Sequence, residues 1–155
     1  MIKSRDTTDI DDDFDLSRFL NAQEAIYGKV LAELRSGQKQ SHWMWYIFPQ
    51  IEGLGESAVS KRYAITCLEE ARQYLKHPVL GPRLLECADL VLVIEDRSVS
   101  EIFGYPDDLK LKSSMTLFSC IPEADPVFKE VLEKYFRGSL DSRTIRQLEL
   151  LSEGL

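Results

Sequence analysis

A helical fold is indicated first by the stretch DLSRFLNAQEAIYGKVLAELRSG, residues 15–37. Its apolar side chains recur every three or four residues, which places them on one face of an α-helix. They are Phe19, Leu20, Ile26, Tyr27, Val30, Leu31 and Leu34. Asp15 is suited to cap the start of this helix and Gly37 to end it. The stretch therefore predicts one long amphipathic helix.

Similar patterns follow along the chain, separated by short loops. A second long helix is predicted from a Ser57 cap to Lys76, and Ser98-Val99-Ser100-Glu101 has the form of a capping box. Asp125 and Asp141 are predicted to cap the last two helices. A strand remains an alternative at 41–50, which is rich in aromatic residues, and at 90–94, which is β-branched. The expected fold class is all-α, a compact irregular bundle of six or seven helices in a single domain over 14–155.

The acidic character of the chain is concentrated at its start. Residues 1–15 hold two basic and six acidic side chains, and the whole chain has a net charge of -7. We expect residues 1–13 to form a flexible acidic leader. Without a basic run, general binding to nucleic acid is not expected, because phosphate neutralisation supplies most of that affinity.

Other classes are disfavoured by what the sequence lacks. No apolar run is long enough to span a bilayer, and the start has no secretion signal, so we expect no membrane association and a cytoplasmic location. The three cysteines, Cys67, Cys87 and Cys120, are expected to be buried free thiols. Neither they nor the two histidines have the spacing of metal ligands, so we expect no metal and no cofactor.

The least ordinary stretch is Ser41-His42-Trp43-Met44-Trp45-Tyr46-Ile47-Phe48-Pro49-Gln50. Ser41 is a plausible cap for a short helix that Pro49 ends. Several of its side chains bring polar atoms that need partners when buried. The candidate residues for lining a pocket for a planar or cationic ligand are His42, Trp43, Trp45, Tyr46 and Gln50. The alternative is that the aromatic rings are core, with their polar atoms bonded to loop carbonyls.

A second candidate is the helix start at 106–116. Lys110, Ser113 and Ser114 fall on adjacent faces and would hold a phosphate or carboxylate if they turn into a cleft. Asp107 and Asp108 at the same start would repel an anion, however. The alternative is a helix capped by one of these aspartates, with a solvated lysine face and small serines at a helix contact. The nearby loop 50–57, with Gly53 and Gly55, is interpreted as a tight turn, since it lacks the remainder of a dinucleotide-binding fingerprint.

Several strings together resemble one known family. They are residues 41–50, Gly-Leu-Gly at 53–55, Tyr-Ala-Ile at 63–65, His-Pro-Val-Leu-Gly-Pro-Arg-Leu at 77–84, residues 102–118 and Tyr-Phe-Arg-Gly at 135–138. The chain resembles the bacterial domain-of-unknown-function family 1810 over residues 14–150. The resemblance implies a mostly α-helical fold, like that of a mycobacterial member of known structure. It implies no catalytic residues.

Two functions follow as hypotheses. The first is binding of, or catalysis on, a small organic or nucleotide-like molecule. It requires the 107–116 helix start to pack beside 42–50, and His42, a tryptophan ring and Lys110 or Ser113 to converge on one pocket. In an enzyme, His42 would be the general acid or base. The second is a non-enzymatic interaction module that docks a protein partner through 41–50. The sequence leaves the oligomeric state and any enzymatic activity open.

Overall fold

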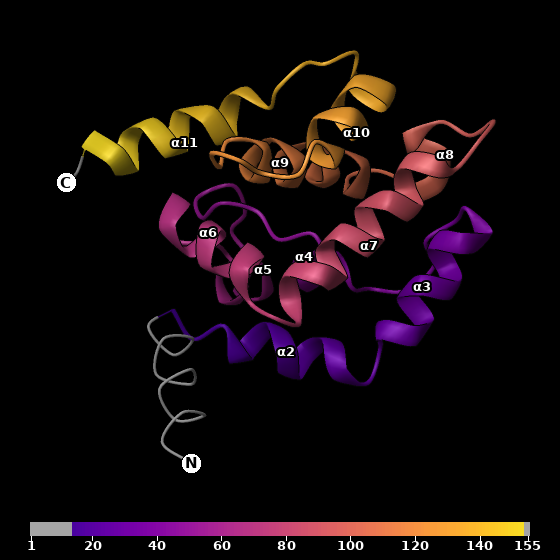
Figure 1. The fold of residues 1–155 in the computed structure, drawn as a ribbon, viewed down its shortest axis with the longest axis horizontal. Helices are drawn as coiled ribbons and strands as arrows, with labels where there is room; N and C mark the ends of the chain where they lie inside the picture. The colour runs from indigo at the N-terminus through magenta and orange to yellow at the C-terminus, as the bar shows by residue number, and fades with distance from the viewer. Residues whose placement is uncertain (1–13, 154–155) are drawn as a thin grey trace.

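The computed structural model describes residues 14–153, which form ten helices joined by short loops (Figure 1). In chain order they are α2 (Ser17–Glu24), α3 (Tyr27–Ser36), α4 (Met44–Ile47), α5 (Ala58–Arg62), α6 (Leu68–Lys76), α7 (Leu80–Val93), α8 (Val99–Phe103), α9 (Asp107–Ser119), α10 (Val127–Phe136) and α11 (Ser142–Glu153). The predicted all-α class is confirmed for this part of the chain, with more helices than the six or seven expected. The predicted acidic leader, 1–13, lies outside the described residues.

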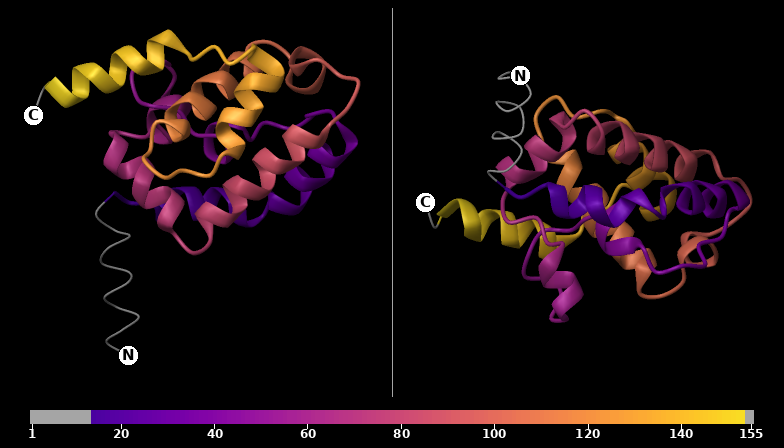
Figure 2. Two further views of the ribbon diagram at one scale, coloured as in Figure 1. Left: turned by 45° about the horizontal axis from the view of Figure 1, so that its top comes forward. Right: turned by 90° about the horizontal axis from the view of Figure 1, so that it is seen from below.

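Helix α9 is the centre of the bundle. Helices α6, α8, α10 and α11 pack on it, and every side chain from Ser113 to Phe118 is buried. Helix α7 packs on α3, α6 and α10, so that α2 and α3 lie on one side of the fold and α10 and α11 on the other (Figures 1 and 2). A chain of ring contacts runs through the core from Phe19 to Tyr74, Phe118 and Phe128, with centroid distances of 5.1, 5.6 and 5.7 Å.

The first predicted helix, 15–37, is two helices. The helix is interrupted by a turn at Ala25 and Ile26, and the φ of Ile26 is -116°. This break lets α2 pack on α4 while α3 packs on α7. The Gln23 amide, just before the break, turns inward and donates to the Tyr46 carbonyl (2.7 Å) and the Tyr74 hydroxyl (3.1 Å). The predicted cap is also wrong: Asp15 has a φ of +52° and accepts from the Ser17 hydroxyl instead.

The second predicted helix, 57–76, is also divided. Ser57 caps α5 as predicted, accepting from the Ser60 N–H, but that helix ends at Arg62. The chain is then held in a short bridge to residues 50–52. The Ile65 N–H donates to the Gln50 carbonyl and the Glu52 N–H donates to the Ile65 carbonyl, each at 2.8 Å. These two bonds replace the helical ones, and they fix the loop after Gln50 against the body of the protein.

The remaining helix starts agree better with prediction. The capping box at Ser98 and Glu101 is present, and Asp125 and Asp141 accept N–H groups at the starts of α10 and α11. The segment 90–94 is helical through Val93, so the strand alternative there is wrong. Gly81 lets α7 approach α6 closely, because a Cβ at this position would lie 2.1 Å from the Leu75 carbonyl oxygen. Among the described residues, no helix has the length and apolar character needed to cross a membrane.

Candidate functional site

The segment 40–43 is organised by a buried carboxylate, that of Glu33 on α3. It accepts hydrogen bonds from the Gln40 N–H (2.7 Å), the Ser41 N–H (3.0 Å), the Ser41 hydroxyl (2.6 Å) and the Trp43 indole N–H (2.9 Å). Burial alone would raise the pKa of Glu33, but these bonds together lower it to about 2. Both the N–H and the hydroxyl of Ser41 therefore bond to Glu33, and Ser41 does not cap α4 as predicted. The Trp43 N–H finds a carboxylate instead of the loop carbonyl expected for a core ring.

A second carboxylate connects the aromatic segment to the start of α9. Asp107 lies 2.8 Å from the Lys39 ammonium and 3.5 Å from that of Lys110. Each lysine in turn lies over a tryptophan ring: Lys39 over Trp43 at 4.9 Å from the centroid, and Lys110 over Trp45 at 4.7 Å. The α9 start thus packs beside 42–50. The small-molecule hypothesis requires this arrangement, and it also requires His42 and either Lys110 or Ser113 to converge with a tryptophan ring on one pocket.

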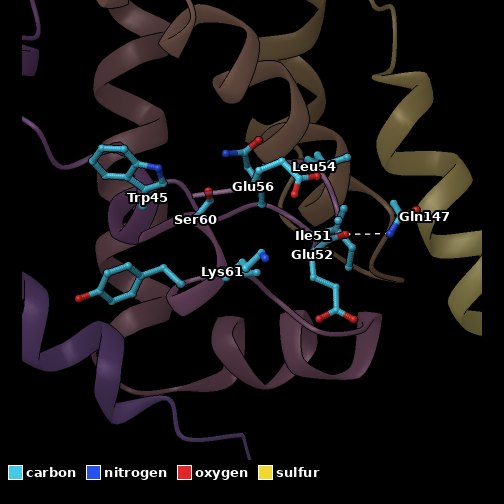
Figure 3. A pocket seen from close by; sticks show the side chains of 13 residues that line it. Trp45, Ile51, Glu52, Leu54, Glu56, Ser60, Lys61 and Gln147 are labelled. Carbon is cyan, nitrogen blue, oxygen red and sulfur yellow. Dashed lines mark hydrogen bonds between the residues drawn. The ribbon is translucent and has the colours of Figure 1, made fainter. Parts of the chain in front are cut away.

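Beside Trp45 lies a cavity of about 430 Å³, here named the Trp45 cavity (Figure 3). Its wall is formed by the end of the aromatic segment, the loop 51–56 and residues 60, 61, 63 and 64, with Gln147 contributed by α11. In Figure 3, Trp45 and Gln147 stand at opposite ends of the cavity, with Ser60 and Lys61 between them. The site therefore combines segments nearly a hundred residues apart in sequence.

Helix α11 fixes the loop that forms one side of the cavity. The Gln147 amide donates to the Glu52 carbonyl at 2.9 Å, and the Arg143 guanidinium donates to the Leu54 carbonyl at 2.8 Å. Gly53 makes this approach possible, because it has a φ of +94° and a Cβ there would lie 2.2 Å from the Gln147 amide nitrogen. The loop interpreted as a tight turn is thus also a cavity wall.

The predicted site residues do not all gather here. Trp45 and Gln50 line the cavity, while Lys110 contacts the Trp45 ring without lining it. Trp43 is fully buried in the core, and His42 is exposed and outside the cavity lining. Tyr46 packs on Tyr63 with ring centroids 5.3 Å apart. Burial, and to a smaller extent Tyr63, raises the pKa of Tyr46, so its phenol stays neutral.

The two predicted serines lie inside the bundle. The Ser113 hydroxyl lies within hydrogen-bond distance of two acceptors for its single proton, the Leu109 carbonyl (3.3 Å) and the Asp141 carboxylate (3.0 Å). The Ser114 hydroxyl is fully buried and has no hydrogen-bond partner among the described residues. Neither serine lines the Trp45 cavity. The helix start therefore contributes Lys110 to the site, through Trp45, and contributes neither serine.

Sequence reasoning missed several residues of this arrangement. Glu33 could have been noticed, because it is an acidic side chain spaced with Val30 and Leu34 on the apolar face of its helix. Tyr63 falls within the helix predicted from Ser57 to Lys76 and was not a candidate site residue, yet it lines the cavity. Gln147 has no local signal, since its position depends on how α11 returns to the loop at Gly53.

The described residues offer little for metal or thiol chemistry. They contain no group of three or more His, Cys, Asp or Glu side chains placed to hold a metal ion. The three cysteines are free, with Cys87 buried as expected and Cys67 and Cys120 half-buried. Burial raises the pKa of the Cys87 thiol to about 12 and raises that of Cys120 as well, so neither is a ready thiolate nucleophile.

Comparisons with known proteins agree with this fold. A family model described as "Protein of unknown function (DUF1810)" matches residues 13–148. The chain is also similar to the conserved hypothetical protein Rv1873 from Mycobacterium tuberculosis, whose crystal structure it matches with a TM-score of 0.88. The two are 53% identical, over 89% of this chain and 99% of that chain. A comparison with curated proteins gives no match.

Proposed function

The chain belongs to the DUF1810 family, and we propose that it binds a small planar organic molecule in the Trp45 cavity. The observation that carries the proposal is the state of the Trp45 indole. Its ring lines the cavity, and its N–H has no hydrogen-bond partner among the described residues. A half-buried indole with a free donor is suited to stack on a ligand and bond to it.

The dimensions and lining of the cavity support binding of a small molecule. Its volume of about 430 Å³ falls in the range of about 300–1,000 Å³ that is usual for such sites. Two aromatic rings, Trp45 and Tyr63, supply apolar surface, and the Gln50 amide supplies a donor and an acceptor without partners among the described residues. In sites of this kind, a small number of polar groups among aromatic side chains fixes the orientation of the ligand.

Lys110 supports the same proposal by fixing the ring. Its ammonium lies over Trp45 but is not part of the cavity lining, so it holds the indole from outside the cavity. The ammonium is itself held by Asp107 at 3.5 Å. A ring already ordered in this way loses little conformational freedom when a ligand stacks on it, which favours binding.

The test is a screen of planar metabolites by thermal shift and by tryptophan fluorescence. A ligand present at about 100 times its dissociation constant should stabilise the protein by about 2.7 kcal/mol. It should also quench the emission of Trp45. In the variant Trp45→Phe the quenching should disappear, while the emission of the buried Trp43 remains as an internal control. A ligand that quenches Trp45→Phe as strongly as the wild type does not occupy this cavity.

The alternative function, docking of a partner through 41–50, has less support. An interface anchor would be an exposed ring, but Trp43, Met44, Ile47 and Phe48 are buried, and Trp45 and Tyr46 are half-buried. We also propose no reaction, because the expected general acid or base, His42, does not line the cavity. A His42→Gln variant should therefore bind ligands as the wild type does.

A further inference from the structure

The charges of the cavity lining provide no surplus of positive charge for an anion. The lining includes the carboxylates of Glu52 and Glu56 and the ammonium of Lys61. None of the three has an ion-pair partner among the described residues. An entering phosphate, with a charge of about -1.5 to -2, would meet more negative than positive side chains.

The other cations nearby lie outside the cavity lining. Lys39 and Lys110 share Asp107, and the Glu33 carboxylate lies against Trp43, so these four side chains carry no net charge. Arg143 stands at the edge of the loop, where its guanidinium is bonded to the Leu54 carbonyl. Its single charge offsets at most the excess carboxylate of the lining. The Arg62 guanidinium lies over the Tyr63 ring at 5.6 Å but is not part of the lining. The lining residues themselves therefore give a phosphate no net compensation.

A cationic ligand is disfavoured because a cation of the protein already lies over each aromatic ring of the cavity, Trp45 and Tyr63. Lys110 already lies over Trp45 at 4.7 Å, and the Arg62 guanidinium lies over Tyr63 at 5.6 Å. A second cation on either ring would be repelled by the first and would find the π electrons already engaged. The rings are therefore left for stacking with an uncharged planar group.

Two amides supply the polar contacts that such a group needs. The Gln50 amide has no partner among the described residues, and Gln147 uses its nitrogen on the Glu52 carbonyl but keeps its oxygen free. An amide places a donor beside an acceptor. This is the complement of the adjacent donor and acceptor on the edge of a nucleobase.

From these observations we infer that the ligand of the Trp45 cavity is an uncharged nucleobase or nucleoside, and that the cavity discriminates against the phosphorylated form. The inference rests on the proposed function, since it names the class of molecule that the same site takes. Stacking on Trp45 supplies binding energy, the amides read the edge of the base, and the lining charges exclude the phosphate.

The test compares each of adenosine, guanosine, cytidine and uridine with its 5′-monophosphate, and includes phenyltrimethylammonium as a planar cation. Dissociation constants are measured by quenching of Trp45 on the full chain. At least one nucleoside should bind, and its monophosphate should bind at least about tenfold more weakly, because the excess carboxylate of the lining repels the phosphate.

Variants assign this difference to the lining. The double variant Glu52→Gln, Glu56→Gln should bring the dissociation constant of the monophosphate to within about threefold of that of the nucleoside. Lys61→Gln should widen the difference. The matched control is Glu149→Gln, which removes one exposed carboxylate of α11 outside the cavity lining and should leave the difference unchanged.

Each result decides a different point. A monophosphate that binds as tightly as its nucleoside, or a planar cation that binds more tightly than every nucleoside, overturns the inference and leaves the proposed function standing. So does binding confined to planar molecules of other classes, such as indoles or flavins. If no planar molecule quenches Trp45, both the inference and the proposed function fail.

Discussion

Trp43 and Trp45 stand two residues apart, each with a lysine ammonium over its ring, and both lysines are bound to Asp107. Their surroundings are nevertheless different. Trp43 is fully buried and its indole N–H is taken by Glu33, whereas Trp45 is half-buried, lines a cavity and has no partner for its N–H among the described residues. Whether a ring lies in the core or at a cavity wall therefore depends here on what accepts its polar atom, more than on the local sequence.

The largest expected effect comes from truncating each ring in turn. Trp43→Ala should lower the free energy of unfolding by about 4 kcal/mol, because it leaves a large cavity in a closely packed core. Trp45→Ala should lower it by only about 1 kcal/mol, because the half-buried ring already borders open space. Urea denaturation of the two variants measures both values. Equal losses would contradict the distinction between core and cavity wall.

The next effect concerns Glu33, the group that makes Trp43 part of the core. Glu33→Gln should cost about 3 kcal/mol at pH 7, since a lowered carboxyl pKa is a direct contribution to stability. That contribution is fully present above the unfolded pKa of about 4.5 and is lost as pH falls toward the folded pKa of about 2. The difference between wild type and variant should therefore shrink over this range. Denaturant titrations at several pH values measure it, and a difference that stays constant down to pH 2 would refute the assignment.

The same comparison explains which parts of the fold the sequence could predict. Local signals were sufficient where both partners are close in sequence, as in the capping box at Ser98 and the cap at Asp141. The predicted helix 57–76 was divided by a pairing with Ile51, a contact between two distant segments that no local periodicity encodes. Helical spacing continues through Tyr63 and Ala64, so the pattern gave no reason to end the helix there.

The candidate site likewise contains residues that the sequence could predict and residues that it could not. Trp45, Gln50 and Lys110 were identified because aromatic and charged residues were conspicuous in their segments. The separation of Trp45 from Trp43 required Glu33, which is ten residues earlier on another helix. The far wall required Gln147, which reaches Gly53 only through the path of α11. Residue type identified candidates, and tertiary contacts decided between them.

A substitution of Asp107 tests the feature that the two tryptophans share, a lysine over the ring that is bound to Asp107. Asp107→Asn removes the carboxylate shared by Lys39 and Lys110, and the Lys39 side chain is only 6% exposed. The loss should be about 1.5 kcal/mol, more than for a surface pair because Lys39 would stay largely buried without its counter-charge. Urea denaturation measures it. Glu149→Gln, an exposed carboxylate without an ion pair among the described residues, is the control and should change stability by less than about 0.5 kcal/mol.

The smallest effect isolates the cation over the cavity wall. Lys110→Gln removes the ammonium from the Trp45 ring, and it should cost only about 0.5 kcal/mol, because this lysine is partly solvated. Its spectroscopic effect should be clearer. With one face of the indole uncovered, acrylamide should quench Trp45 more strongly, while the emission of Trp43 stays unchanged.

Lys112→Gln is the matched control, because that lysine lies on the same helix over Phe136, at 5.8 Å, and contacts neither tryptophan. If Lys110→Gln and Lys112→Gln alter the quenching equally, Lys110 does not hold the ring. If only Lys110→Gln alters it, and the affinity for a stacking ligand falls with it, then the ammonium orders the indole in advance. The two rings would then differ in function for one physical reason: the core ring is fixed by a bond to its N–H, and the cavity ring is fixed by a charge on its face that leaves the N–H free.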